Sequence, residues 1–550
     1  MSVYSMKKIA RTFLVTVVLI LLATVSAMAA KTPETHFEPL SKAYLDWLEA
    51  QKKNENGTGV FTTDKTHSTG YIPFHIDLSH LADNPPIEDT GPGIKETIPT
   101  KYDLRNVGGN NYVTSVKNQN PYGTCWAHAS IGAIESNLLK KGLGIYDLSE
   151  AHLAWFTFRN TSNKHKTYEN LSDNLATVFN HGGSAFYATT IFARLEGPTT
   201  ETEAPYPNKP TKSTPESYTR PVRLRDAYYL ALSSGTININ NSTEARNIVK
   251  KRIMDNGAVV ASFYAGAGAT SGSGTSTVSY YDNSSNSTSP NHAIILVGWD
   301  DSYSSSKFSP NPGMNGAWLV KNSWGTSWGD GGYFWMSYAQ YLTDGTAFIA
   351  EKADPNMKVY DNSPLGWGGT WGYSSSPIYT ANVFKSERDN EKLTEVGFFT
   401  ADNNVTYDID VYTSTSTSMP SNPITGSSVS KMSGTMPYAG WHVVTLNTPV
   451  ALTKGNYFSV VVTFKNRGKA PVEMKGGATS NAVIEAGSFF SYNGTNWTAG
   501  TVENINANAN TDSNADKADN HNNLAGNRLR RTAVQPTAHS VRHNADNLVC

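Results

Sequence analysis

The segment that decides the fold runs from Val116 to Ala127 and reads VKNQNPYGTCWA. A glycine-containing loop delivers Cys125 to the start of a helix expected near residues 127–141, whose apolar residues recur at helical spacing. Unpaired N–H groups and the positive end of the helix dipole favour the thiolate, which is the nucleophilic form of cysteine. Most free cysteines are small buried hydrophobes, but this placement predicts a nucleophile.

The neighbouring residues supply the partners that such a nucleophile needs. Gln119 lies upstream of Cys125, where its amide and the Cys125 backbone N–H can donate to one carbonyl oxygen, as in an oxyanion hole. A base and a group that orients it are also required. His292 begins one buried apolar run and Asn322 ends another, so adjacent strands would present both side chains at one end of a sheet. Trp324 follows Asn322 and could shield an Asn–His hydrogen bond from water.

The composition narrows the classes of function. A chain of 550 residues is long enough for two or three domains of roughly 150 residues each. The net charge of −1 offers no electrostatic case for nucleic acid or an acidic lipid surface. Cys125 and Cys550 are the two cysteines, so we do not expect disulfides to hold the fold together. No residue pattern calls for a cofactor or a metal.

Changes in composition and in the pattern of apolar residues divide the chain into five segments. Residues 1–29 have a basic start, a short apolar run and an Ala-Met-Ala end, which is typical of a signal peptide. Residues 30–98 form a polar pro-segment, expected to be weakly structured apart from one helix. Residues 99–353 show helices followed by strands, which indicates an α+β domain. Residues 354–498 alternate as in an antiparallel β-sandwich, and residues 499–550 have the composition of a disordered tail.

These motifs resemble the papain family of cysteine proteases. Gln119, Cys125-Trp126, His292-Ala293 and the run KNSWG from Lys321 to Gly325 match its signature segments. The resemblance extends over residues 99–353 and implies a two-lobed fold, with a cleft between a helical half and a β-rich half. It implies Cys125 as nucleophile, His292 as base and then acid, Asn322 as the group that orients His292, and Gln119 as oxyanion donor.

The resemblance also implies where substrate binds. Gly182 and Gly183 resemble the family's Gly-Gly stretch that pairs with substrate backbone, and Ala293 and Trp324 flank the site. An imidazolium beside Cys125 would lower its pKa, as it does in papain. Two features depart from the family: its usual disulfides are missing, and the spacing from Cys125 to His292 exceeds the roughly 130–150 residues of its signature. Gly/Ser/Pro-rich insertions at 266–290 and 301–316 account for part of that excess.

The stretch from Gly70 to Leu81 resembles microbial papain-like proteases that carry a lectin-like β-domain. Trp367, Trp371 and Trp441 of the β-rich region are expected to be core or surface aromatics rather than a sugar-binding platform. The sequence thus predicts an exported, monomeric cysteine endopeptidase, made as a zymogen, that acts on proteins or peptides. Its secretion could end in the medium, the periplasm or the cell surface. Two other functions stay open: an adhesin whose β-domain binds cell-surface carbohydrate, and a ligase that transfers the same acyl group to an amine.

Overall fold

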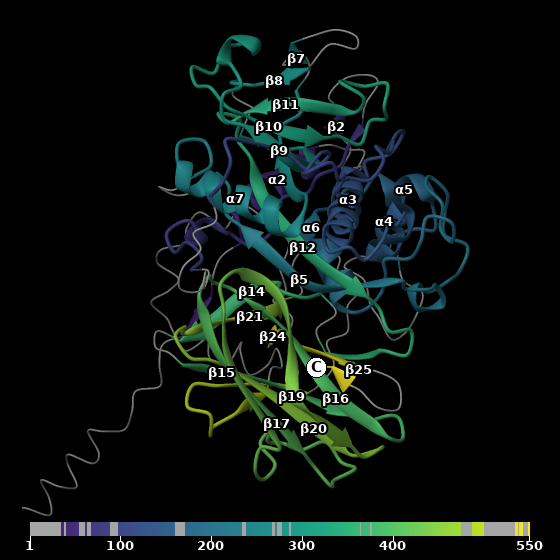
Figure 1. Cartoon of the computed structure of the whole chain (residues 1–550). Coiled ribbons are helices and arrows are strands. Elements are labelled where there is room, and N and C mark those ends of the chain that lie inside the picture. Colours follow the sequence, from purple (N-terminus) through teal and green to yellow (C-terminus); the bar gives the residue numbers. More distant parts are fainter. Residues whose placement is uncertain are drawn as a thin grey trace, which may run out of the picture.

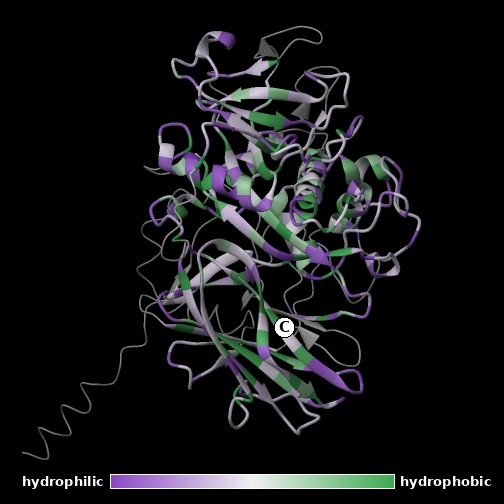
Figure 2. Ribbon diagram, in the orientation of Figure 1, coloured by the Kyte–Doolittle hydropathy of each residue, from purple (hydrophilic) through white to green (hydrophobic). Residues whose placement is uncertain are grey.

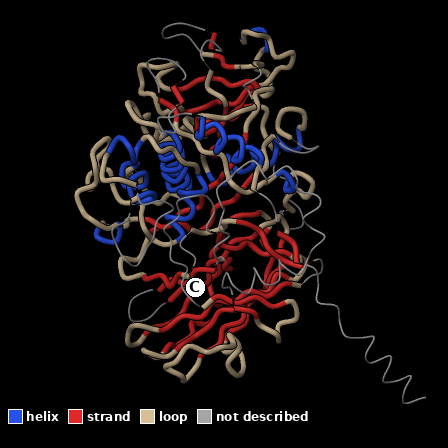
Figure 3. Tube along the Cα trace, turned by 180° about the vertical axis from the view of Figure 1, so that it is seen from behind, coloured by secondary structure: helices blue, strands red, loops and turns tan. Residues whose placement is uncertain are grey.

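The structure is a computed structural model that describes residues 35–37, 40–53, 61–62, 68–87, 97–159, 171–233, 238–266, 270–271, 278–284, 288–362, 365–373, 377–474, 487–499, 534–536, 538–542 and 548–549. The predicted signal peptide, residues 1–29, lies outside the described residues, as does Cys550. Figures 1 and 3 show that the larger helices gather in one half of the molecule, whereas strands run through both halves.

The helical half is built around α3 (Cys125–Lys140), which is buried from Cys125 to Leu138. The helix predicted near residues 127–141 is this element, and it begins two residues earlier than its apolar spacing suggested. It is buried on all sides because helices α4 and α6 cover one face and strands β9 and β12 cover another. The accompanying helices are α4 (Glu150–Phe158), α5 (Leu175–Phe179), α6 (Ala185–Ala193) and α7 (Thr243–Asn256).

The β-rich half contains the strands that carry the predicted histidine and asparagine. Strand β9 (His292–Asp300) pairs antiparallel with β6 (Val259–Phe263) on one side and with β10 (Ala317–Lys321) on the other. The start of β9 therefore lies beside the end of β10. Part of the predicted 266–290 insertion also joins this sheet, because β8 pairs with β11. The other strands are β4 (Lys101–Asp103), β5 (Val222–Leu230), β7 (Thr270–Ser271), β8 (Ser279–Tyr280), β11 (Tyr333–Ser337) and β12 (Thr343–Lys352).

The C-terminal region is the predicted β-sandwich. A six-stranded sheet in the order β18-β17-β20-β15-β22-β23 packs against strands β16 and β19 across a shared hydrophobic core. Trp367, Trp371 and Trp441 are buried, so they are core residues. Figure 2 shows hydrophobic residues along the strands of this region and along those of the domain that contains α3. The strands are β13 (Lys358–Asp361), β14 (Gly369–Tyr373), β15 (Ile378–Lys385), β16 (Glu391–Thr400), β17 (Val405–Thr413), β18 (Ser430–Met436), β19 (Ala439–Leu452), β20 (Tyr457–Phe464), β21 (Lys469–Met474), β22 (Ser488–Ser491) and β23 (Thr498–Ala499).

The two domains are joined through one continuous sheet. Strand β19 of the C-terminal domain pairs with β5 of the domain that contains α3, at Ala439↔Tyr229 and the next two positions. Beside this seam Glu395 pairs with Arg223 at 2.7 Å and with Arg225 at 2.8 Å. Burial alone would raise the pKa of Glu395, but the two guanidinium groups outweigh it and lower that pKa.

The disorder predicted for residues 499–550 is wrong for three short stretches. Strands β24 (Val534–Pro536), β25 (Ala538–Arg542) and β26 (Leu548–Val549) pair with β21, β16 and each other. Open sheet edges provide backbone partners that composition does not reveal. The remainder of that predicted tail beyond Ala499 lies outside the described residues.

We call the predicted pro-segment, residues 30–98, the leader. It is also more ordered than its composition predicted. It contains α2 (Lys42–Lys53), which is the helix that the sequence predicted, and the short elements β1 (Thr35–Phe37), β2 (Phe61–Thr62), β3 (Ser68–Thr69) and η1 (Ser79–Leu81). Tyr71, Ile72 and Phe74 belong to the same core as α3. The expectation of a weakly structured leader is therefore wrong for residues 71–82, because most of their apolar side chains are buried by other parts of the chain.

Candidate active site

Cys125 is the first residue of α3 and is fully buried. The loop before it ends at Thr124, the residue at the helix N-cap position. The backbone N–H of Ala293 donates a hydrogen bond to the Cys125 Sγ at 3.5 Å. This contact brings the helix N-terminus against the first residues of β9, although the two are far apart in sequence.

His292 and Asn322 meet at the end of the sheet. His292 opens β9 and Asn322 directly follows β10, and the His292 Nε2 lies 2.8 Å from the Asn322 Oδ1. The Trp324 ring stacks on the imidazole with 4.6 Å between the ring centroids. The amide fixes the orientation of the ring, and the indole covers one of its faces. With Nε2 directed to Asn322, Nδ1 is the nitrogen that can exchange a proton with a thiol.

Gln119 is buried next to the nucleophile. Its Oε1 accepts a hydrogen bond from the Ser323 hydroxyl at 2.7 Å, which ties it to the segment that carries Asn322. Its Nε2 donates to the carbonyl oxygen of Tyr122 at 3.1 Å and to that of Ser68 at 2.9 Å. An amide that already binds a peptide carbonyl is in a suitable position to bind an oxyanion.

Gly182 and Gly183 lie in the loop between α5 and α6 and contact the leader. The Gly183 N–H donates to the Gly70 carbonyl, and the Ile72 N–H donates to the Gly183 carbonyl, both at 2.8 Å. A Cβ at Gly183 would lie 2.5 Å from the Trp126 ring, and one at Gly182 would lie 2.8 Å from the Gly70 carbonyl oxygen. Glycine is required at Gly183 because the Trp126 ring lies so close, and at Gly182 because the leader backbone does.

The leader therefore occupies the predicted cleft. A further contact, from the Tyr71 N–H to the Asn291 carbonyl oxygen at 3.2 Å, completes a line of main-chain bonds from Gly70 to Ile72. Sequence reasoning did not identify Asn291 as a binding residue. Any residue type offers a backbone carbonyl, so no sequence signal could have identified it, except its position directly before His292.

The thiol of Cys125 differs from the sequence-based expectation. Burial raises its pKa to about 11, although the N–H groups of Ala293, Gly70, Trp126 and Cys125 itself favour the thiolate and lower it. Burial by the leader thus opposes the lowering of this pKa that an adjacent imidazolium would bring. The helix N-terminus is where the sequence predicted it, but the leader covers the sulfur and excludes water.

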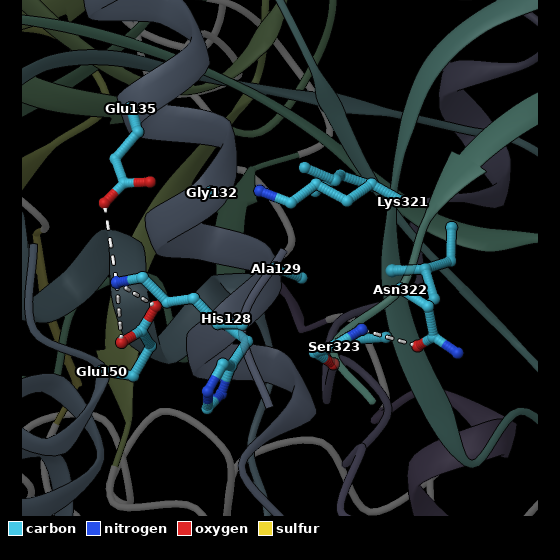
Figure 4. A pocket seen from close by; sticks show the side chains of 12 residues that line it. His128, Ala129, Gly132, Glu135, Glu150, Lys321, Asn322 and Ser323 are labelled. Carbon is cyan, nitrogen blue, oxygen red and sulfur yellow. Dashed lines mark hydrogen bonds and ion pairs between the residues drawn. The ribbon is translucent and has the colours of Figure 1, made fainter. Parts of the chain in front are cut away.

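A small polar cavity of about 20 Å³ lies behind Asn322, between α3 and strands β9 and β10. Lys117 pairs with Glu150 at 2.9 Å, and the Lys321 ammonium group extends toward α3 near Gly132 (Figure 4). Burial lowers the pKa of Lys321 to about 8. A cavity of this size holds about one water molecule and is too small for a peptide side chain.

Comparison with known proteins agrees with this geometry. A family described as papain family cysteine protease matches residues 98–353, and one described as lectin like domain matches residues 359–511. The chain carries a papain-family cysteine protease domain. A lectin-like domain follows it. The papain-family domain contains Gln119, Cys125, His292 and Asn322, and the cleft contacts of Gly182 and Gly183.

Sequence relatives of the papain-family domain include cathepsin K of Mus musculus and vignain of Ricinus communis. Both are 28% identical, over 239 and 277 residues, which are 43% and 49% of this chain. The matched part spans 59% and 63% of the length of these relatives.

Solved structures share the arrangement of both domains. One is of the cysteine protease and lectin-like domains of Cwp84, a surface layer associated protein of Clostridium difficile; it covers 93% of this chain and 99% of that chain, with a TM-score of 0.68 and 23% identity. Clostridial Cwp84 after propeptide cleavage covers 80% of this chain and 98% of that chain, with a TM-score of 0.62 and 24% identity. At these identities the likeness shows the fold.

Among the residues that the structure describes, no cluster of histidine, cysteine, aspartate or glutamate is arranged to hold a metal ion. No helix in the same residues has the length and apolar character needed to cross a membrane.

Proposed function

We propose that this chain is a cysteine endopeptidase that is exported as a zymogen. The observation that carries the proposal is the meeting of three distant segments, with the Cys125 Sγ 3.5 Å from the Ala293 N–H and His292 held by Asn322 at 2.8 Å. A nucleophile, a base and a group that orients the base are the parts that covalent catalysis of peptide cleavage needs.

The roles follow from the atoms. His292 accepts the thiol proton on Nδ1, and the Cys125 sulfur attacks the carbonyl carbon of the substrate. The Gln119 Nε2 and the Cys125 N–H stabilise the oxyanion that forms. The protonated His292 gives its proton to the leaving amine, and the resulting thioester is hydrolysed by water. Asn322 keeps the ring in one tautomer and orientation throughout.

The contacts of the leader account for latency. The Gly70 N–H of the leader lies close enough to the Cys125 sulfur to favour the thiolate, so the leader presents an N–H group to the nucleophile rather than a carbonyl carbon. With the cleft filled and the thiol pKa raised to about 11, the precursor has neither an accessible site nor a thiolate at neutral pH. Removal of the leader would expose the cleft and return water to the sulfur.

Export and substrate class rest on the sequence and the relatives. The basic and apolar features of residues 1–29 support secretion, and the related Cwp84 is associated with a surface layer. The main-chain bonds at Gly183 and Asn291 suit an extended peptide, and they do not depend on the peptide's side chains. Protein or peptide substrates are therefore proposed, with apolar or aromatic residues accepted at the second position before the cut.

Labelling with an epoxide probe that reacts with active-site thiols tests the proposal. We expect the matured protein to be labelled at Cys125 and to cleave a fluorogenic peptide library. Cys125→Ala should lose both properties, while Cys550→Ala, which removes the other cysteine, should keep them. Labelling confined to Cys550, or peptide turnover by Cys125→Ala, would contradict the proposal. Adding an amine acceptor to the same reaction separates hydrolysis from acyl transfer.

A further inference from the structure

Beyond the cleft, the leader continues onto the lectin-like domain. His80 contacts the Ala401 carbonyl oxygen through Nε2 at 2.7 Å, and residues up to Ile87 lie along the loop between β16 and β17. We call this loop, residues 401–404, the docking loop. It faces a leader segment, residues 80–87, that makes none of the cleft contacts described above.

Two asparagines of the docking loop bind the leader backbone. The Asn403 Nδ2 donates to the carbonyl oxygens of Asn84 at 2.9 Å and Leu81 at 3.3 Å. The Asn404 Nδ2 donates to the Pro85 carbonyl oxygen at 2.8 Å and to the Asn84 side-chain Oδ1 at 3.2 Å. The Asn404 Oδ1 accepts the Ile87 N–H at 2.6 Å. Within the described residues, every hydrogen bond of the Asn404 side chain goes to the leader.

The lectin-like domain holds the docking loop in place with contacts of its own. Arg467 donates to the Asn403 carbonyl oxygen at 2.8 Å and pairs with Asp402 at 3.1 Å. The Asn403 Oδ1 accepts the Ala439 N–H at 2.9 Å. Asn404 adopts a φ of 58°, a left-handed conformation that costs energy in residues other than glycine. A strained and pre-organised loop loses little entropy when it binds a peptide.

The other side of the same leader segment is apolar. Leu81, Ala82, Pro85 and Pro86 line a cavity of about 20 Å³ together with residues of α7, the end of β5 and Tyr438. Both domains therefore contribute walls. The small size of the remaining cavity indicates that the leader nearly fills the junction between the domains.

We propose that this junction is a peptide-docking exosite for leader residues 80–87, which it binds independently of the catalytic cleft. The inference rests on the proposed function, because a leader that blocks no enzyme would need no such retention. The exosite recognises an extended, proline-containing backbone through the amides of Asn403 and Asn404. A leader that has been cut in the stretch after Ile87 therefore stays bound, and activation requires its release from the exosite as well as the cut.

The cleft contacts and the exosite contacts act as parts of a multivalent ligand, to which the pairing of β1 with β14 also contributes. Residues 75–79 are a short connection between the cleft contacts and the exosite contacts, so either part is held at a high effective concentration while the other is bound. Loss of the exosite contacts should then speed the release of the whole leader, including the part that covers Cys125.

The experiment uses the full chain with Cys125→Ala, so that no self-cleavage occurs. A recognition sequence for a site-specific protease replaces Gly91-Pro92-Gly93, and release of the fluorescently labelled leader is followed after the cut. We expect the leader to remain bound in this parent. Asn404→Gly removes three hydrogen bonds and relieves the positive φ, so it should release the leader at least about tenfold faster. Release at the parent rate would overturn the proposal.

Asn390→Gly is the matched control, because Asn390 is an exposed asparagine of the same domain with a φ of 60°. It should release the leader at the parent rate. As a second measurement, an excess of a synthetic peptide of residues 78–90 should speed release in the parent and have no effect in Asn404→Gly. A peptide without effect on the parent would also count against the exosite. None of these measurements requires cleavage by this chain itself, so they are independent of the proposed protease activity.

Discussion

The catalytic cleft and the domain junction bind the same leader by different chemistry. In the cleft, main-chain groups of Gly183 and Asn291 pair with main-chain groups of residues 70–72. At the junction, the side-chain amides of Asn403 and Asn404 bind the leader instead. Both surfaces bind mostly backbone groups of the leader. The cleft does so with main-chain groups that any residue type supplies, whereas the junction uses two asparagine side chains that a single substitution can remove.

The largest effect should come from a residue that serves the leader and the chemistry together. Gln119→Ala removes the amide that binds the Ser68 carbonyl and would bind the oxyanion, so kcat of the matured enzyme should fall by about 10²–10³. The measurement is steady-state turnover of a peptide substrate. Asn404→Gly is the comparison variant and should leave kcat unchanged. An equal loss of kcat in both variants would remove the distinction between cleft and junction.

Access to the nucleophile in the precursor tests the cleft contacts alone. A Cβ at Gly70 would lie 1.9 Å from the Gly123 carbonyl oxygen, so Gly70→Ala should expel the leader from the cleft. We expect thiol alkylation of Cys125 in the uncut precursor to become faster by roughly a hundredfold, since a clash of this kind costs several kcal/mol. Ser68→Ala keeps the carbonyl that Gln119 binds and should change the rate only a few-fold. If both variants react alike, the leader is not held by backbone fit.

The smallest effect is a pH dependence of leader release. Burial raises the pKa of Asp344 to about 7, although the Phe74 N–H of the leader lowers it, and burial lowers the pKa of His75 in the leader to about 4. Exposed groups titrate near 4 and 6.5, respectively. Asp344 therefore takes up a proton when the leader binds. Because that proton becomes scarcer as the pH rises from about 4 to 7, Asp344 weakens leader binding over this range. His75 gives up a proton and weakens binding as the pH falls from about 6.5 to 4.

Separate variants should uncover these opposing slopes. His75→Gln should leave the leader most tightly bound near pH 4, and Asp344→Asn should leave it most tightly bound at neutral pH, each with changes of about tenfold in release rate. The measurement is release of the cut leader from the Cys125→Ala protein between pH 4 and 8. The double variant should show neither slope. A pH profile in either single variant that matches the parent would contradict the assignment.

Parts of this fold could be predicted because they carry local chemistry. The helix at Cys125, the strands that begin at His292 and end before Asn322, and the alternating strands of the lectin-like domain all have periodic apolar patterns. The order of the leader was not predicted because its apolar residues, such as Tyr71, Ile72 and Phe74, are few and lie in a polar stretch. Their burial depends on partners far along the chain. The burial of the Cys125 thiol was not predicted for the same reason, since the leader that covers it lies far away in the sequence.

The sequence by itself determined the kinds of groups available for catalysis and the order in which they occur, because residue type and local periodicity are properties of neighbouring positions. Only the tertiary structure decided what covers those groups. It placed Gly70 against Gly123 beside the nucleophile, and it placed Asn403 and Asn404 against a leader segment more than 300 residues away in the chain. Such contacts depend on the packing of whole domains, and neither backbone carbonyls nor single asparagines carry a sequence signal of their partners.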